Sequence, residues 1–260
     1  MEQMEYEEIM FDDFINESLN EDYWFEFYLP QWSNRVLSRP SYILENSVLK
    51  LFIRDNQKPW CPKWNGNVKV SNLQTGVFSG PLGSSLGQHH FTDNLIVQEE
   101  QKKEIKVSLH YGIVEFKARC RIGSDNVAAL WLIGIEEKVE ESAEICLFEL
   151  KGTNVKKTKS VIGYGVHPFA DPYVKDCFFE ESFKIDVADW NVYAFDWYPT
   201  GIDFYINGKL IKRVPESPNY PMQLMINFYD IGCSNNNYTF FEIDYIKVAK
   251  NLTYGGYARR

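Results

Sequence analysis

The sequence lacks the features of a nucleic-acid-binding or membrane protein. Its 260 residues carry 27 lysines and arginines against 36 aspartates and glutamates, which gives a formal net charge of −9. A protein that binds a phosphate backbone replaces counterions with a stripe of basic side chains, and this chain has none, so nucleic acid is excluded as a partner. No apolar run approaches the roughly 18 residues of a membrane-spanning helix, which argues against a membrane partner.

Cysteine is also scarce, and its spacing fits neither a metal site nor a disulfide framework. The five cysteines are an odd number and do not form metal-ligand pairs: Cys61, Cys120, Cys146, Cys177 and Cys233. The first eight residues are acidic and lack the basic, apolar start of a secretion signal. The sequence therefore predicts a reduced, cytoplasmic protein, although a secreted protein whose signal has been removed would look the same.

No Pro/Gly/Ser-rich linker, repeat or low-complexity tract divides the chain, so the sequence predicts a single domain over residues 1–260. Much of it alternates apolar and polar residues with the period of a strand, as in residues 111–119. Asn207-Gly208 between two such segments predicts a type I′ hairpin turn. Residues 59–87 are rich in Pro, Gly, Asn and Ser and predict long loops of the kind that often carry function.

Residues 144–149, Glu-Ile-Cys-Leu-Phe-Glu, contain two carboxylates that strand geometry can bring together. In a regular strand Glu144 and Cys146 share one face and Glu149 lies on the other. A β-bulge of one residue would return Glu149 to the face of Glu144. The pair would then span roughly 13 Å of strand at about 3.3 Å per residue. If the side chains lean together, roughly 5–6 Å remains between the carboxylates, about the separation in a retaining glycosidase.

These six residues resemble the Glu-Ile-Asp-x-x-Glu strand of glycoside hydrolase family 16, the laminarinase- and lichenase-like enzymes. The resemblance implies that Glu144 is the nucleophile and Glu149 the acid/base. Cys146 stands where the family has an Asp that assists the nucleophile. A neutral thiol is a poorer hydrogen-bond donor than a protonated Asp, so we expect reduced rather than abolished activity.

Other segments resemble the family in its own order, from about residue 11 to residue 248. They are residues 11–24, 111–119, 128–134, 160–167, 189–212, 221–229 and 241–248. Val127 replaces a Trp that borders the cleft in laminarinase-like members. Gly163 and Gly165 are expected to mark a place where another molecule approaches the backbone.

The resemblance implies an all-β fold, a β-jelly-roll sandwich of two antiparallel sheets with a concave substrate cleft. It implies a retaining endo-acting hydrolase of a β-linked polysaccharide, a β-1,3 or mixed-linkage glucan, that requires no cofactor for its chemistry. Trp131, Asn227 and Tyr229 are expected to line the cleft. His167 fits either a cleft position or a structural one. A structural calcium ion would be bound by Asp244, with Asp13 as a weak second ligand.

Two other functions stay open at this point. The first is a non-catalytic carbohydrate-binding protein on the same fold, in which the cleft persists and the chemistry is lost through Cys146. The second is a cysteine-based or redox activity of Cys146, although a buried cysteine most often serves as small apolar packing. Four residues in the loops near the start suit either sugar platforms or packing: Trp32, Arg39, Trp60 and Trp64.

Overall fold

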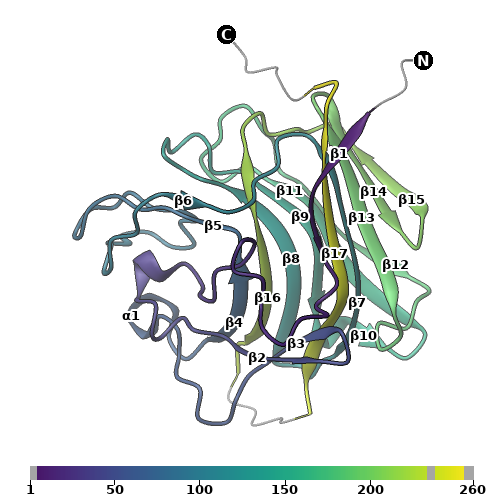
Figure 1. The fold of residues 1–260 in the computed structure, drawn as a ribbon, viewed down its shortest axis with the longest axis horizontal. Helices are drawn as coiled ribbons and strands as arrows, with labels where there is room; N and C mark the ends of the chain where they lie inside the picture. The colour runs from purple at the N-terminus through teal and green to yellow at the C-terminus, as the bar shows by residue number, and fades with distance from the viewer. Residues whose placement is uncertain (1–4, 233–237, 255–260) are drawn as a thin grey trace.

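The computed structural model describes residues 5–232 and 238–254 and shows two antiparallel sheets packed face to face (Figure 1). We call the first the back sheet; its order is β15-β14-β13-β7-β17-β3-β2, with β1 paired to β17. Its strands are β1 Tyr6–Asp12, β2 Ser41–Glu45, β3 Val48–Phe52, β7 Gly112–Arg121, β13 Asn191–Tyr198, β14 Gly201–Ile206, β15 Lys209–Val214 and β17 Phe240–Asn251. The expected jelly-roll sandwich is confirmed.

The second sheet, here called the cleft sheet, has the order β10-β11-β9-β8-β16-β4, with β12 paired to β11. Its strands are β4 Lys69–Gln74, β8 Asn126–Gly134, β9 Glu144–Lys151, β10 Val155–Lys156, β11 Lys159–His167, β12 Cys177–Phe183 and β16 Met222–Asp230. The remaining elements are short: β5 Gly76–Val77 and β6 Glu104–Ile105, which pair, α1 Pro62–Asn65, and the 3₁₀ turns Pro30–Trp32 and Gly152–Asn154. Among the described residues, no helix is long and apolar enough to cross a membrane.

The main core lies between the two sheets, because alternation gives each sheet one apolar face. In β7, Val114, Phe116 and Ala118 are completely buried, as the alternation of residues 111–119 predicted. Phe148 of the cleft sheet stacks on Phe241 of the back sheet, with ring centroids 5.8 Å apart and an interplanar angle of 17°. Aromatic side chains thus fill much of the space between the layers.

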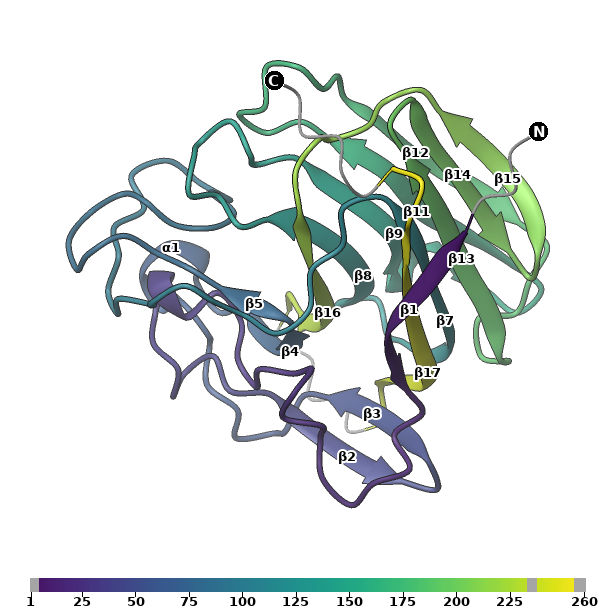
Figure 2. The same cartoon turned by 45° about the horizontal axis from the view of Figure 1, so that its top comes forward.

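The first and last strands of the chain lie side by side. Tyr6 of β1 pairs with Asn251 of β17, and Figure 1 and Figure 2 both show the purple and yellow strands running together.

At the other side of the back sheet, Asn207 and Gly208 join β14 to β15 with φ values of +50° and +73°. Two consecutive positive φ angles are those of a type I′ turn, so the predicted hairpin is confirmed.

One extra residue interrupts β9 between the two glutamates. Against β8, Leu130 pairs with Phe148 and Trp131 pairs with Cys146, which leaves Leu147 without a partner of its own. The register against β11 shifts over the same stretch of β9. The predicted bulge is therefore confirmed.

Gly163 and Gly165 of β11 are close to β12 of the same chain. A Cβ added at Gly165, where φ is +133°, would lie 2.2 Å from the carbonyl oxygen of Cys177. A Cβ at Gly163 would lie 2.7 Å from the ring of Phe178. The expectation that these glycines admit another molecule is wrong, because β12 itself takes the space.

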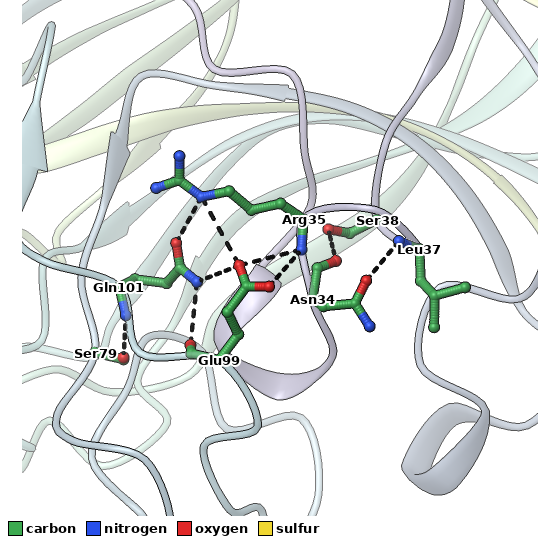
Figure 3. A network of polar contacts seen from close by, with 7 residues as sticks. All are labelled: Asn34, Arg35, Leu37, Ser38, Ser79, Glu99 and Gln101. Carbon is green, nitrogen blue, oxygen red and sulfur yellow. Dashed lines mark hydrogen bonds and ion pairs between the residues drawn. The ribbon is translucent and has the colours of Figure 1, made fainter.

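The long loops of the first hundred residues gather with α1 beside β4 and β16, well away from β13, β14 and β15 (Figure 2). Polar contacts fasten these loops to one another (Figure 3). The Gln101 N–H donates to Ser79 Oγ at 2.9 Å, and Arg35 Nε donates to Gln101 Oε1, also at 2.9 Å. The Arg35 N–H reaches the Glu99 carboxylate at 3.3 Å. These contacts tie three segments of the loops to one another.

Candidate active site

Both glutamates of β9 open into one cavity of about 300 Å³ on the outer face of the cleft sheet. Glu144, Cys146 and Glu149 contribute from β9, because the bulge at Leu147 restores the shared face. The rest of the wall comes from neighbouring strands and from loops: Tyr28, Trp60, Asn65, Val68, His89, Phe91, Val127, Ala129, Trp131, Tyr229 and Ile231. The strand thus presents a pair of carboxylates to a hollow lined mainly by aromatic and apolar side chains.

Glu144 is half-buried and surrounded by protein on the sides away from the cavity. Burial, and after it the charge of Glu149, raise the pKa of Glu144 to about 8. Within the described ranges no group donates a hydrogen bond to its carboxylate, so nothing offsets the cost of burying the charge. The nucleophile's role that the resemblance implies for Glu144 requires an ionised carboxylate, whereas burial favours its protonated form.

Glu149 has a basic neighbour that Glu144 lacks. Lys151 Nζ lies 3.3 Å from Glu149 Oε1 and 2.9 Å from Glu180 Oε1. The ammonium group thus holds one oxygen of the Glu149 carboxylate. The two carboxylates differ in surroundings although they come from one strand.

Cys146 lies between the two glutamates with only 1% of its surface exposed. Burial, and then the charges of Glu144 and Glu149, raise the pKa of the thiol well above its ordinary value. A cysteine acts as a nucleophile through its thiolate, which this environment suppresses. The structure therefore opposes the cysteine-based alternative. Cys233 lies outside the described residues, and the other four cysteines are free thiols.

Trp131 and Tyr229 line the cavity, as expected from the resemblance. Asn227 is on the same face of β16 but is completely buried beneath them. Its Oδ1 accepts a hydrogen bond from Trp131 Nε1, and its Nδ2 donates to Asn72 Oδ1 at 2.8 Å. Asn227 thus fixes the indole of Trp131 and does not itself line the cavity.

His167 pairs directly with Glu144 across β11 and β9, so the two side chains are on the same face. Its ring stacks on Phe178, with centroids 4.4 Å apart, and its Nδ1 lies 2.9 Å from Asp176 Oδ1. The side chain is 34% exposed. His167 therefore borders the Glu144 end of the site without lining the cavity.

The two predicted calcium ligands have other surroundings. Lys117 Nζ lies 2.9 Å from Asp244 Oδ2, so a lysine already supplies the positive charge at that carboxylate. Asp13 is half-exposed and accepts the Ile15 N–H at 3.4 Å. In residues 5–232 and 238–254, no three His, Cys, Asp or Glu side chains gather around a common point. Calcium takes six to eight oxygens, so Asp244 and Asp13 do not suffice, and calcium stays a prediction.

Sequence reasoning missed the loop residues of the wall. Tyr28, His89 and Phe91 line the cavity, and none of them was singled out. Trp60 was considered for either packing or sugar binding, and it is 1% exposed at the cavity wall. The loops predicted over residues 59–87 include Trp60 but not Tyr28, His89 or Phe91, and irregular segments have no periodicity that would place a side chain.

Comparisons with known proteins agree with this geometry. The family model described as Glycosyl hydrolases family 16 matches residues 94–247. Glucan endo-1,3-beta-glucosidase A1 of Niallia circulans is 26% identical over 171 residues, which are 56% of this chain and 25% of that protein. The chain thus spans about a quarter of the length of this curated relative.

Two solved structures share the fold. The GlcNAcα1-4Gal releasing endo-β-galactosidase from Clostridium perfringens superposes with a TM-score of 0.84 at 25% identity, over 96% of this chain and 63% of that one. A laminarinase from Flavobacterium sp. UMI-01 has a TM-score of 0.62 at 16% identity, over 93% of this chain and 99% of that one. At that identity the laminarinase shows the likeness of fold alone.

Proposed function

Since the chain belongs to glycosyl hydrolases family 16, we propose that it is a retaining endo-acting hydrolase of a β-linked polysaccharide. Glu144 is the nucleophile and Glu149 the acid/base. The observation that carries the proposal is the bulge at Leu147, which places both carboxylates on one face of β9 and in one cavity. Retaining glycosidases hold their two carboxyl groups about 5–5.5 Å apart.

The reaction requires one proton shared between the carboxyl groups of Glu144 and Glu149. Glu149 gives this proton to the leaving oxygen as Glu144 attacks the anomeric carbon, which forms a covalent glycosyl intermediate. Glu149 then takes a proton from water, and the resulting attack releases the sugar with its original configuration. Two close carboxylates resist double ionisation, so the pair retains a proton into the neutral range. Lys151, at 3.3 Å, keeps Glu149 in place through both steps.

The substrate we propose is a β-1,3 or mixed-linkage glucan, with β-galactans as the competing class. The glucan proposal follows the name of the Niallia relative, and the galactan alternative follows the name of the Clostridium structure. Val127 leaves an apolar, open wall where laminarinase-like members have a Trp. Incubation with a panel of both glycan classes, followed by chromatography of the products, tests the proposal. Oligosaccharides of intermediate length from one class would support it, and no new reducing ends from any glycan would contradict it.

A carbohydrate-binding protein without activity is the second candidate, and one observation favours it. The Glu144 carboxylate has no hydrogen-bond donor among the described residues, and its pKa is raised to about 8. A carboxyl group that burial keeps protonated is a poor nucleophile. Binding of oligosaccharide without any release of reducing ends would identify this function.

Replacing Cys146 with Asp is expected to raise the rate about tenfold, provided that the slot accepts the carboxyl group. A protonated Asp would donate a hydrogen bond to Glu144, and such a bond to a charged group is worth about 1.5–3 kcal/mol. The bond stabilises the ionised nucleophile and leaves the proton on Glu149. Initial rates on polysaccharide measure the effect. Cys146→Ala, which adds no donor, is the matched control and should stay near the wild-type rate; an equal gain in both variants would rule out the hydrogen bond.

The raised pKa of Glu144 predicts a pH-dependent stability. Above its ordinary value of 4.5 the unfolded chain loses this proton, whereas the folded protein keeps it until about pH 8. The folded state then binds more protons, so this carboxyl lowers stability progressively as the pH rises through that window. Glu144→Gln removes the titration, so its stability advantage over the wild type should grow between pH 5 and pH 8 in urea unfolding. A difference that stays constant would show that Glu144 ionises normally.

A further inference from the structure

His89 reaches the cavity from the loops and has no role in the two-glutamate chemistry. Its ring centroid is 4.8 Å from that of Trp131 and 5.1 Å from that of Phe169, each in an edge-on arrangement. In the part of the chain that the structure describes, neither ring nitrogen has a hydrogen-bond partner. Packing thus fixes the plane of the imidazole while its nitrogens stay available to a molecule in the cavity.

The backbone of His89 is held in an uncommon conformation. Its φ is +54°, in the left-handed region that non-glycine residues rarely adopt. The His89 N–H donates to Glu136 Oε1 at 2.6 Å, and Glu136 is only 2% exposed. A residue kept in such a conformation by a buried partner is a candidate for function, because the surrounding structure must enforce it.

The residue before His89 is fastened from two other segments. The Gln88 carbonyl accepts hydrogen bonds from Gln31 Nε2 at 2.9 Å and from Trp32 Nε1 at 2.8 Å. The side-chain Nε2 of Gln88 donates to the Gly134 carbonyl, at the end of β8, at 3.1 Å. The tip of the loop is thereby tied to the N-terminal loop and to the cleft sheet. This arrangement presents His89 as a pre-organised group, which is what precise recognition requires.

The charges around the cavity select the kind of sugar. Its described wall contains two carboxylates, Glu144 and Glu149, and no lysine or arginine. Burial lowers the pKa of His89 to about 4, so the imidazole adds no positive charge under neutral conditions. A sugar with a carboxylate or sulfate would find no lysine or arginine in this wall to pair with. An uncharged hydroxyl suits a neutral imidazole, which has one donor and one acceptor nitrogen.

We infer that His89 is a substrate-binding residue whose imidazole hydrogen-bonds a hydroxyl of an uncharged sugar unit in this cavity. Phe169, which is 45% exposed and packs edge-on against His89, offers an apolar surface beside it. Sugars present apolar faces as well as hydroxyl groups, so the two side chains suit one ligand. The inference rests on the proposed function, since it assumes a glycan in the cavity.

The test compares His89→Phe, which keeps an aromatic ring against Trp131 but removes both nitrogens, with His89→Gln, which keeps a donor and an acceptor. His110→Gln is the matched control, since His110 lies near Asn219 Oδ1 and does not line the cavity. Binding of neutral β-glucan and β-galactan oligosaccharides is measured calorimetrically in the Glu144→Gln background, and KM and kcat with Glu144 intact. Thermal unfolding checks that each variant is folded.

We expect His89→Phe to weaken binding and raise KM about three- to tenfold, the effect of one lost hydrogen bond, with a smaller change in kcat. His89→Gln should recover part of the loss, and His110→Gln should bind like the parent. Unchanged KM and binding in His89→Phe would overturn the inference and leave the proposed function intact if hydrolysis persists. Tighter binding of uronate or sulfated oligosaccharides than of neutral ones would also overturn it. No binding and no hydrolysis of any glycan by the parent protein would overturn both.

Discussion

Glu144→Ala is expected to abolish hydrolysis of every glycan substrate, with a loss in kcat on the order of 10⁵-fold or more. Without this carboxylate the proposed nucleophile is lost, and Cys146 does not replace it because burial favours its protonated thiol. Binding of oligosaccharide should persist, since the aromatic wall of Trp131 and Tyr229 is unchanged. Reducing-end release and calorimetric binding, measured on the same preparation, separate these two properties.

The matched control for this variant is Glu140→Ala. Glu140 is an exposed residue of the acidic run just before β9 and does not line the active-site cavity. The Glu140→Ala protein should hydrolyse glycans at the wild-type rate. A Glu144→Ala protein that keeps activity within tenfold of the wild type would show that the nucleophile lies elsewhere.

Glu149→Ala is expected to lose about 10²- to 10⁴-fold on polysaccharide, the usual contribution of a positioned acid. Aryl glycosides with good leaving groups should be cleaved to the glycosyl intermediate at nearly the wild-type rate, because their departure needs little help from a proton. Hydrolysis of the glycosyl intermediate should be slow in this variant, since Glu149 also activates the attacking water. The variant should therefore show a burst of phenol followed by slow turnover.

A stopped-flow series of aryl glycosides with increasingly acidic phenols measures this burst. Glu180→Gln is a control for indirect effects, because Glu180 binds the same Lys151 at 2.9 Å without lining the cavity. It should retain the wild-type dependence on the leaving group. If Glu149→Ala loses the same factor on every substrate, whatever the phenol, Glu149 is not the acid.

The strands and the central carboxylate pair were predictable because they depend on local periodicity. A type I′ hairpin turn requires two consecutive positive φ angles, and Asn207 and Gly208 are residues that adopt them readily. The bulge at Leu147 followed from one condition, that Glu144 and Glu149 share a face, since a strand of uniform register cannot satisfy it. Period-two alternation likewise placed Trp131 and Tyr229 on the outer face of the cleft sheet.

The finer structure of the site was not predictable, because it depends on contacts between distant segments. Asn227 lies on the predicted face of β16 but is covered by the indole of Trp131, and alternation does not predict such packing. His89 comes from a loop whose conformation depends on Glu136, 47 residues away. The elevated pKa of Glu144 likewise reflects burial and the nearby charge of Glu149, which depend on the assembled cavity.

The central claim is that Glu144 and Glu149 hydrolyse an internal β-glycosidic bond with retention. The most direct measurement is proton NMR of the reducing ends released in the first minutes from the best polysaccharide of the glucan and galactan panel. The account predicts that the β-anomer appears first and the α-anomer only as mutarotation proceeds, with no reducing ends from Glu144→Ala. An initial α-anomer would contradict the retaining mechanism. Tight oligosaccharide binding without new reducing ends from the wild type would show a binding protein instead.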